Sequence, residues 1–487
     1  MNPSLLSDAP PLLNGLAAGA LAGLLAGLPT FFLAIVLLVL LLAVGTMLAR
    51  GLGVHQWGIP EALIAGSLGL LLAPGGVRPL LPPAVISLWE QLPLVLLTLV
   101  FGSLLVGKPL PKPAGLWRPL SAQVLLALSL AFGQFFVAGV TVLLVLQPLL
   151  HVSPVLACLI EVAYEGGHGS AAAMGPTYER LGVEGGTELG LAMATVGLLA
   201  STLVGGLVVV LARRQGWLGT AASATSPAAA TQEPAGPAPL EAEKKTEEAA
   251  TTIPPWRGAA DRLALWSVNL GLAGIAVAIG WVLLELLRLL AGRAGGGFAM
   301  VIDALPVFPL ALIGSLLVRL ALERGGQASR VSTPVQARIG TVSADLLIVA
   351  ATACLDLSLL ARDWLPLATL AIGGLAWNLA VVLLLGRRIL PAPWFQRSII
   401  EFGQATGVAA SGLLLLSMAD PHDSGDAITP FSIKQLLLQP LLAGGVITVV
   451  APLAVDGWGL PIWTGFCAGL VLLWGGLGLW LARAAPP

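Results

Sequence analysis

Long runs of consecutive apolar residues recur along the whole chain and restrict its fold more than any other feature. One of them, Thr30–Ala49, reads TFFLAIVLLVLLLAVGTMLA. A helix of this length is long enough to cross the hydrocarbon core of a bilayer. Because hydrocarbon offers no partners for backbone groups, each run must satisfy its hydrogen bonds within its own segment. The runs therefore predict an all-α polytopic membrane protein.

Composition supports this prediction and excludes several kinds of partner. The chain is 57% hydrophobic and 10% charged, whereas soluble domains carry about 25% charged residues. Its net charge of −1 argues against binding to nucleic acid. The three cysteines lie in separate apolar segments and HExxH is absent, so the sequence predicts no metal site, no disulfide and no cofactor.

A polar segment divides the chain into two halves. Residues 223–255 are rich in Ala, Pro, Thr and Glu and contain almost no large apolar residue. Such a segment cannot bury enough surface to offset the entropy of ordering, so we expect a disordered linker. The predicted organisation is an extra N-terminal span (1–27), a first repeat (28–212), the linker (213–262), a second repeat (263–455) and an extra C-terminal span (456–487).

The two halves share four short echoes in the same order. PEALIAGSL, from Pro60, resembles PLALIGSL, from Pro309, and WRPL at 117–120 resembles WLPL at 364–367. GGHGSAAAMG at 166–175 aligns with GQATGVAASG at 403–412, and a Gly-Gly pair follows each loop, at 205–206 and 444–445. Internal repeats in a membrane protein are typical of secondary transporters, with the substrate site at the repeat interface.

The distribution of Lys and Arg predicts the orientation. If each Gly-rich loop is re-entrant, most basic residues fall on one face, which the positive-inside rule makes cytoplasmic. The linker and both termini then lie in the cytoplasm, and five spans per half invert the second repeat relative to the first. The expected spans are 28–50, 59–76, 86–107, 117–150 and 187–212 in the first repeat, and 263–289, 298–322, 338–361, 364–386 and 431–455 in the second.

The Gly-rich loops are the candidate binding site. A helix break at membrane depth is tolerated only where it is buried in protein or lines a cavity. Half-helix N-termini can then hold a substrate carboxylate, while carbonyls and hydroxyls hold a cation. The candidate substrate-binding residues are Gly166, Gly167, His168, Gly169, Ser170, Gly403, Gln404, Thr406 and Gly407. The candidate cation-coupling residues are Ser170, Thr406, Glu165 and Glu401.

The first loop also carries a resemblance to a known family. Residues 166–206 resemble the first Gly-rich loop and following span of the sodium/glutamate symporters, and IPEAL, from Ile59, resembles their early proline motif. This resemblance implies inverted five-helix repeats, re-entrant loops, a cytoplasmic linker, a homodimer and sodium-coupled uptake of glutamate. The second loop lacks the family's Thr-Pro, and neither Glu165 nor Glu401 belongs to the family motif.

We therefore expect a sodium-coupled symporter of glutamate or a related carboxylate in the plasma (inner) membrane, and not an enzyme. One alternative is coupling to protons through Glu165 or Glu401; another is a different organic anion. A channel or receptor is a further class, and an intramembrane hydrolase is disfavoured because His168 and Ser170 are only two residues apart on a helix.

Several side chains keep a structural interpretation beside the functional one. His168 has the alternative of simple packing, and Glu165 and Glu401 that of lying among headgroups. Polar residues within the spans are interpreted as interhelical hydrogen bonds; they are Gln123, Gln134, Asn269 and Asn378.

Overall fold

The computed structural model describes residues 11–52, 61–74, 76, 78–107, 117–218, 259–294, 302, 305–420, 427–439 and 441–484. These residues form helices and connecting turns, without a strand among them. Eight helices in the described part are long and apolar enough to cross a bilayer. The prediction of an all-α chain with the helices of a polytopic membrane protein is therefore confirmed. Most of the predicted linker (219–258) lies outside the described residues.

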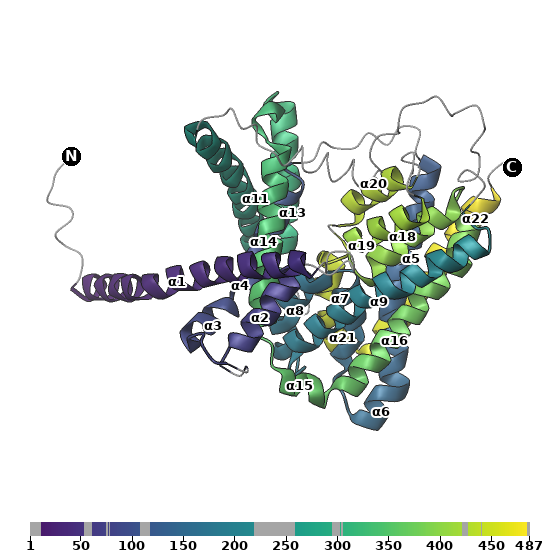
Figure 1. The fold of residues 1–487 in the computed structure, drawn as a ribbon, viewed down its shortest axis with the longest axis horizontal. Coiled ribbons are helices and arrows are strands. Elements are labelled where there is room, and N and C mark those ends of the chain that lie inside the picture. The colour runs from purple at the N-terminus through teal and green to yellow at the C-terminus, as the bar shows by residue number, and fades with distance from the viewer. Residues whose placement is uncertain are drawn as a thin grey trace.

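The helices pack as two bundles (Figure 1). The first bundle combines the early helices of both halves. The helices of this bundle are α1 (Pro11–Gly51), α2 (Glu61–Leu72), α3 (Pro83–Trp89), α4 (Leu92–Leu104), α11 (Ala259–Ala294), α13 (Phe308–Arg324) and α14 (Thr333–Ala353). Helix α4 packs against α11, α13 and α14, while α1 and α2 pack against each other and against α14. Figure 1 shows α1 extending sideways from this bundle.

The second bundle combines the later helices of both halves. Its long member α5 (Trp117–Thr141) continues through a π-helical turn into α6 (Gln147–Leu150), and α5 packs against α16 and α22. The first half of the chain contributes two short helices, which pack against a long one. The short helices are α7 (Leu159–Tyr164) and α8 (Gly167–Arg180), and the long helix is α9 (Gly186–Arg214). The later members are α16 (Trp364–Ala380), α18 (Trp394–Thr406), α19 (Ala409–Ala419), α20 (Ile428–Leu438), α21 (Val446–Trp458) and α22 (Leu460–Arg483).

Helix α8 connects the two bundles. It belongs to the second bundle, where it packs along α9, and it also contacts α4 and α14 of the first. Gly169 lies at this contact, with Leu97 of α4 and Leu347 of α14 as its neighbours. A small residue here lets the helices approach closely. The Gly-rich segment predicted as a binding loop therefore lies where the bundles meet.

Several expected spans differ from the observed helices. The predicted N-terminal span and the next span are one continuous helix over Pro11–Gly51, with Pro29 inside it. The span expected over 298–322 is the helix α13, which begins only at Phe308. The span expected over 431–455 is two helices, α20 and α21, separated by residues 439–445. Ala443 and Gly444 have left-handed backbone conformations, with φ of 55° and 92°, which a continuing helix cannot accommodate.

Candidate functional site

The first Gly-rich segment breaks a helix inside the second bundle. Helix α7 ends at Tyr164, Glu165 and Gly166 form a turn, and α8 begins at Gly167. Gly167 has a φ of +64°, a left-handed conformation that costs a residue with a side chain about 1–2 kcal/mol. The glycine therefore fixes the position of this break.

The second Gly-rich segment folds into a tight helical hairpin. Helices α18 and α19 are joined through Gly407 and Val408, and they pack against each other along their length. Gly403 of α18 lies directly against the backbone of Gly412 of α19, where there is no space for a Cβ atom. Ile400 and Leu416 form a small buried cluster at the same contact. The glycines of GQATGVAASG thus permit the close approach of the two arms.

The two breaks meet. A Cβ atom on Gly167 would lie 3.3 Å from Cγ1 of Val408 and 3.9 Å from the carbonyl oxygen of Gly407. The two loops that align in sequence, more than 200 residues apart, therefore lie side by side in the folded chain. Helix α9 passes both of them, because Gly197 contacts the ring of Tyr164 and the carbonyl of Thr406.

Amide side chains from two long helices hold the hairpin turn. Nε2 of Gln134 and Nδ2 of Asn378 both donate to the carbonyl oxygen of Ala405, at 2.7 and 2.8 Å. Asn378 also donates to Oγ1 of Thr406 at 3.0 Å, and Gln134 donates to Oδ1 of Asn378 at 3.2 Å. The interpretation of these residues as interhelical hydrogen bonds is confirmed. The Thr406 hydroxyl, a predicted cation ligand, is engaged by Asn378.

A buried ion pair lies on the hairpin. Nζ of Lys434, in α20, is 2.9 Å from Oε2 of Glu401, and their side chains are 2% and 1% exposed. Oε1 of Glu401 accepts a hydrogen bond from Gln123 of α5 at 2.8 Å. Glu165, also buried, lies beside Gln404 and within electrostatic range of both Lys434 and Glu401. Both predicted acids thus lie inside the protein and share one lysine.

His168 and Ser170 point toward different elements. Nε2 of His168 lies 3.0 Å from Oγ1 of Thr195 in α9. Thr195 donates its own proton to the carbonyl of Leu191, so the histidine nitrogen is the donor in this pair. The Ser170 hydroxyl lies directly against Gly444, in the segment between α20 and α21. The two side chains are therefore not arranged as a nucleophile and its base.

The structure adds residues that the sequence analysis did not select. Lys434 lies within the apolar run FSIKQLLLQP, and a lone lysine in a predicted span is itself a signal of function. Arg397, which falls between the expected spans 364–386 and 431–455, lies in α18 and is only 5% exposed. Glu161 and Thr448 form a second buried contact, with a hydrogen bond of 2.9 Å between them.

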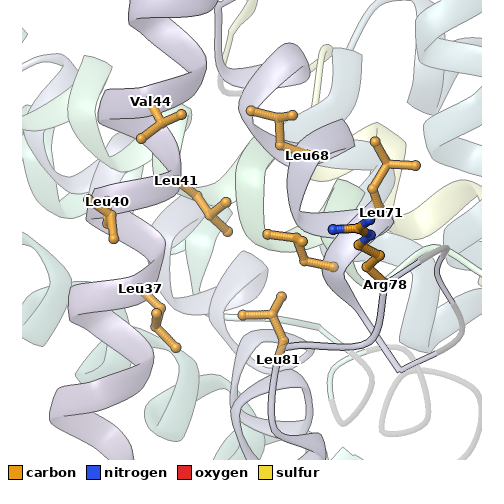
Figure 2. Close-up of a pocket in the computed structure, with 9 residues that line it drawn as sticks. Leu37, Leu40, Leu41, Val44, Leu68, Leu71, Arg78 and Leu81 are labelled. Atoms are coloured by element: carbon orange, nitrogen blue, oxygen red, sulfur yellow. The ribbon is translucent and has the colours of Figure 1, made fainter.

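An apolar pocket lies apart from these polar groups (Figure 2). It has a volume of about 510 Å³ between α1 and α2 of the first bundle. Leucine side chains make up most of its wall, and Arg78 is the one charged lining residue. Such a wall suits hydrocarbon rather than a small carboxylate. Within the described ranges no group of His, Cys, Asp and Glu side chains is arranged to hold a metal ion.

Comparison with known proteins yields no relative. The chain matches no family model, no curated protein and no solved structure. The geometry of the two breaks and the residues around them are therefore the basis for inferring a function.

Proposed function

We propose that this protein is a secondary active transporter, which couples sodium entry to the uptake of glutamate or a related small carboxylate across the plasma membrane. The observation that carries the proposal is the contact between Gly167 and the Gly407–Val408 turn. Two broken helices that meet inside a helical membrane protein present free backbone groups to a common point. The other predicted binding residues lie in α8, in α18 and in the turns that join α7 to α8 and α18 to α19.

The charges around the hairpin support an anionic substrate. Arg397 of α18 and Lys434 of α20 are buried cations, and Glu401 and Glu165 lie close to Lys434. A substrate carboxylate entering this region would compete with Glu401 for the Lys434 ammonium, because charge-assisted hydrogen bonds to a cation are the strongest available there. This exchange would link substrate binding to the position of the hairpin.

The division into two bundles supports alternating access. Each half of the chain contributes its early helices to the first bundle and its late helices to the second. One bundle can then move against the other, with α8 at their contact, and expose the site to each side in turn. We propose that the linker and both termini are cytoplasmic, as the distribution of basic residues indicates. We also propose that the transporter is a homodimer, as the family resemblance implies.

Proton coupling is the second candidate. The observation that favours it is the burial of Glu165 and Glu401 around the single lysine Lys434. When two buried carboxylates lie close together, their mutual repulsion makes one of them hold a proton more tightly. An intramembrane enzyme has less support, because His168 and Ser170 face different helices.

Uptake by proteoliposomes tests the proposal. The purified full-length protein would be reconstituted and given an inward sodium gradient at equal pH on both sides, with radiolabelled glutamate and other dicarboxylates as substrates. We expect accumulation above the external concentration, which disappears without the gradient and in protein-free liposomes. Uptake driven by a pH gradient alone would favour the proton-coupled candidate, and no uptake with any substrate would contradict both.

A further inference from the structure

Glu161 is a completely buried carboxylate whose two oxygens have different surroundings. It lies in α7 with an exposed fraction of 0%. Oε1 accepts hydrogen bonds from the Thr448 hydroxyl at 2.9 Å and from the backbone N–H of Ala443 at 3.4 Å. Oε2 has no hydrogen-bond partner among the described residues. One oxygen is therefore available to a ligand.

No basic side chain of the described residues compensates the charge of Glu161. It takes part in none of the ion pairs found there. The ionisable groups that interact electrostatically with it include Glu165 on its own helix, Cys158 before it, Tyr178 of α8 and Cys467 of α22, and none of these is basic. An unpaired carboxylate in such surroundings is very unfavourable. The carboxyl is therefore neutralised either by a bound proton or by a cation from outside the chain, and the surrounding oxygen atoms decide which of the two fits.

Other oxygen atoms are available near this carboxylate. The Tyr178 side chain interacts electrostatically with Glu161 and is 1% exposed, and its hydroxyl also has no hydrogen-bond partner among the described side chains and backbone. Thr448 is 1% exposed and contacts Glu161 directly. The unwound segment 441–445 lies alongside, since Ala443 contacts Glu161 and Gly444 donates to Thr448 at 3.0 Å. Carboxylate, hydroxyl and carbonyl oxygens are the ligands that hard cations prefer.

We propose that Glu161 binds the coupling sodium ion, with Thr448, Tyr178 and carbonyls of the unwound segment as further oxygen ligands. The inference rests on the proposed sodium-coupled transport and names its cation site. It also relates this site to the substrate loops, because Gly444 contacts Ser170 of α8 on one side and Thr448 on the other. Sodium bound at Glu161 would fix the segment that Ser170 contacts.

Thermal unfolding of the purified full-length protein tests this site without requiring transport. A ligand that binds only the folded state raises the unfolding temperature. The temperature would be measured in sodium chloride and in choline chloride at equal ionic strength and pH. We expect sodium to raise it for the wild type and for Glu179→Gln, which removes an exposed acid from α8. Glu161→Gln should lose the sodium effect, and Thr448→Val should need about tenfold more sodium for the same shift.

Several outcomes would overturn the inference. These are an unfolding temperature of the wild type that does not respond to sodium, an equal sodium response in Glu161→Gln, and a response to pH alone. If Glu161→Gln does not fold, Glu161→Asp and Thr448→Val decide the question through direct binding of ²²Na⁺, which should weaken in both. Sodium-driven uptake retained by Glu161→Gln would contradict this site and leave the transport proposal intact. If sodium stabilises the protein only when Glu161 is present but the protein takes up no substrate, this site would be supported and the transport proposal contradicted.

Discussion

Lys434 and Glu401 form an ion pair of 2.9 Å in which both side chains are almost completely buried. The lysine also contacts Gln435 and lies over the ring of Phe431, 4.6 Å from its centroid. Glu401 is fixed from the other side by Gln123. The pair thus connects α18 with α20, and α5 holds it in place. Because Glu165 lies within range of the same lysine, any change of charge here affects both broken segments.

We expect Lys434→Met to destabilise the protein by about 3–5 kcal/mol, because it leaves the Glu401 carboxylate buried without its cation. The double variant Lys434→Met with Glu401→Gln should recover much of this loss. The free energy of unfolding in detergent measures both. Arg288→Met is the matched control: its pair with Glu285 is 2.8 Å long but over one third exposed on each side, so the loss should be below about 1 kcal/mol. A double variant no more stable than the single one would contradict this account.

We predict that His168→Ala weakens substrate binding by about ten- to a hundredfold, which corresponds to about 1.5–3 kcal/mol. Thr195→Val removes the hydrogen-bond partner of His168 and leaves the imidazole in place. It should cost about 1 kcal/mol of stability and change affinity little. Substrate-dependent shifts of the unfolding temperature measure affinity and stability together. If His168→Ala and Thr195→Val lower affinity and stability alike, and by similar amounts, His168 is a packing residue.

Cysteine labelling tests the proposed orientation. In a background without Cys354, which is partly exposed, single cysteines would replace Arg180, Ser226 and Arg387. The positive-inside rule predicts that positions 226 and 387 react with an impermeant reagent only from the cytoplasmic side. Position 180 should react only from outside. Labelling of positions 180 and 226 from the same side would contradict re-entrant loops.

Deletion of residues 228–250 tests the linker. We expect expression and uptake to stay near the wild-type level, because a segment of this composition has no apolar face to pack and its length changes the entropy of chain closure little. Immunoblotting of membranes and uptake in proteoliposomes measure the two quantities. A Gly/Ser segment of equal length is the control. Loss of expression that this replacement does not restore would assign the segment a structured role.

Hydropathy predicts the helical class well because backbone satisfaction in lipid leaves few alternatives. The alignment of 166–175 with 403–412 also selected the two segments that contact each other in the folded chain, through Gly167 and Val408. The glycines in these segments indicate where the helices break and where they approach closely: Gly167 has a left-handed backbone, and Gly403 permits a close contact with Gly412. Both properties depend on residues near one another in the chain, so one sequence is enough to predict them.

Contacts between distant segments were not predictable in the same way. Lys434, the ion-pair partner of Glu401, is 33 residues from it, and Thr448, which donates to Glu161, is 287 residues from it. Neither spacing has a local signature in the sequence. Hydropathy also missed the break between α20 and α21, because Gly and Ala in an apolar run scarcely lower the average. The boundary expected between residues 27 and 28 is absent: α1 runs through it with Pro29 inside the helix, and membrane helices tolerate proline. The burial of Arg397 was not predictable either, because charge alone does not distinguish a buried arginine from an exposed one.

The central claim is that the junction of the two breaks is the transport site, and one pair of variants tests it most directly. Gly167 and Gly182 both have left-handed backbones, with φ of +64° and +83°, but only Gly167 has a neighbour where a Cβ atom would lie. Alanine at either position should cost about 1–2 kcal/mol of stability. Sodium-driven uptake of the labelled substrate, normalised to folded protein, is the measurement. The account predicts a loss of about tenfold or more for Gly167→Ala, which corresponds to about 1.4 kcal/mol, and near-wild-type rates for Gly182→Ala. Equal uptake by the two variants would contradict it.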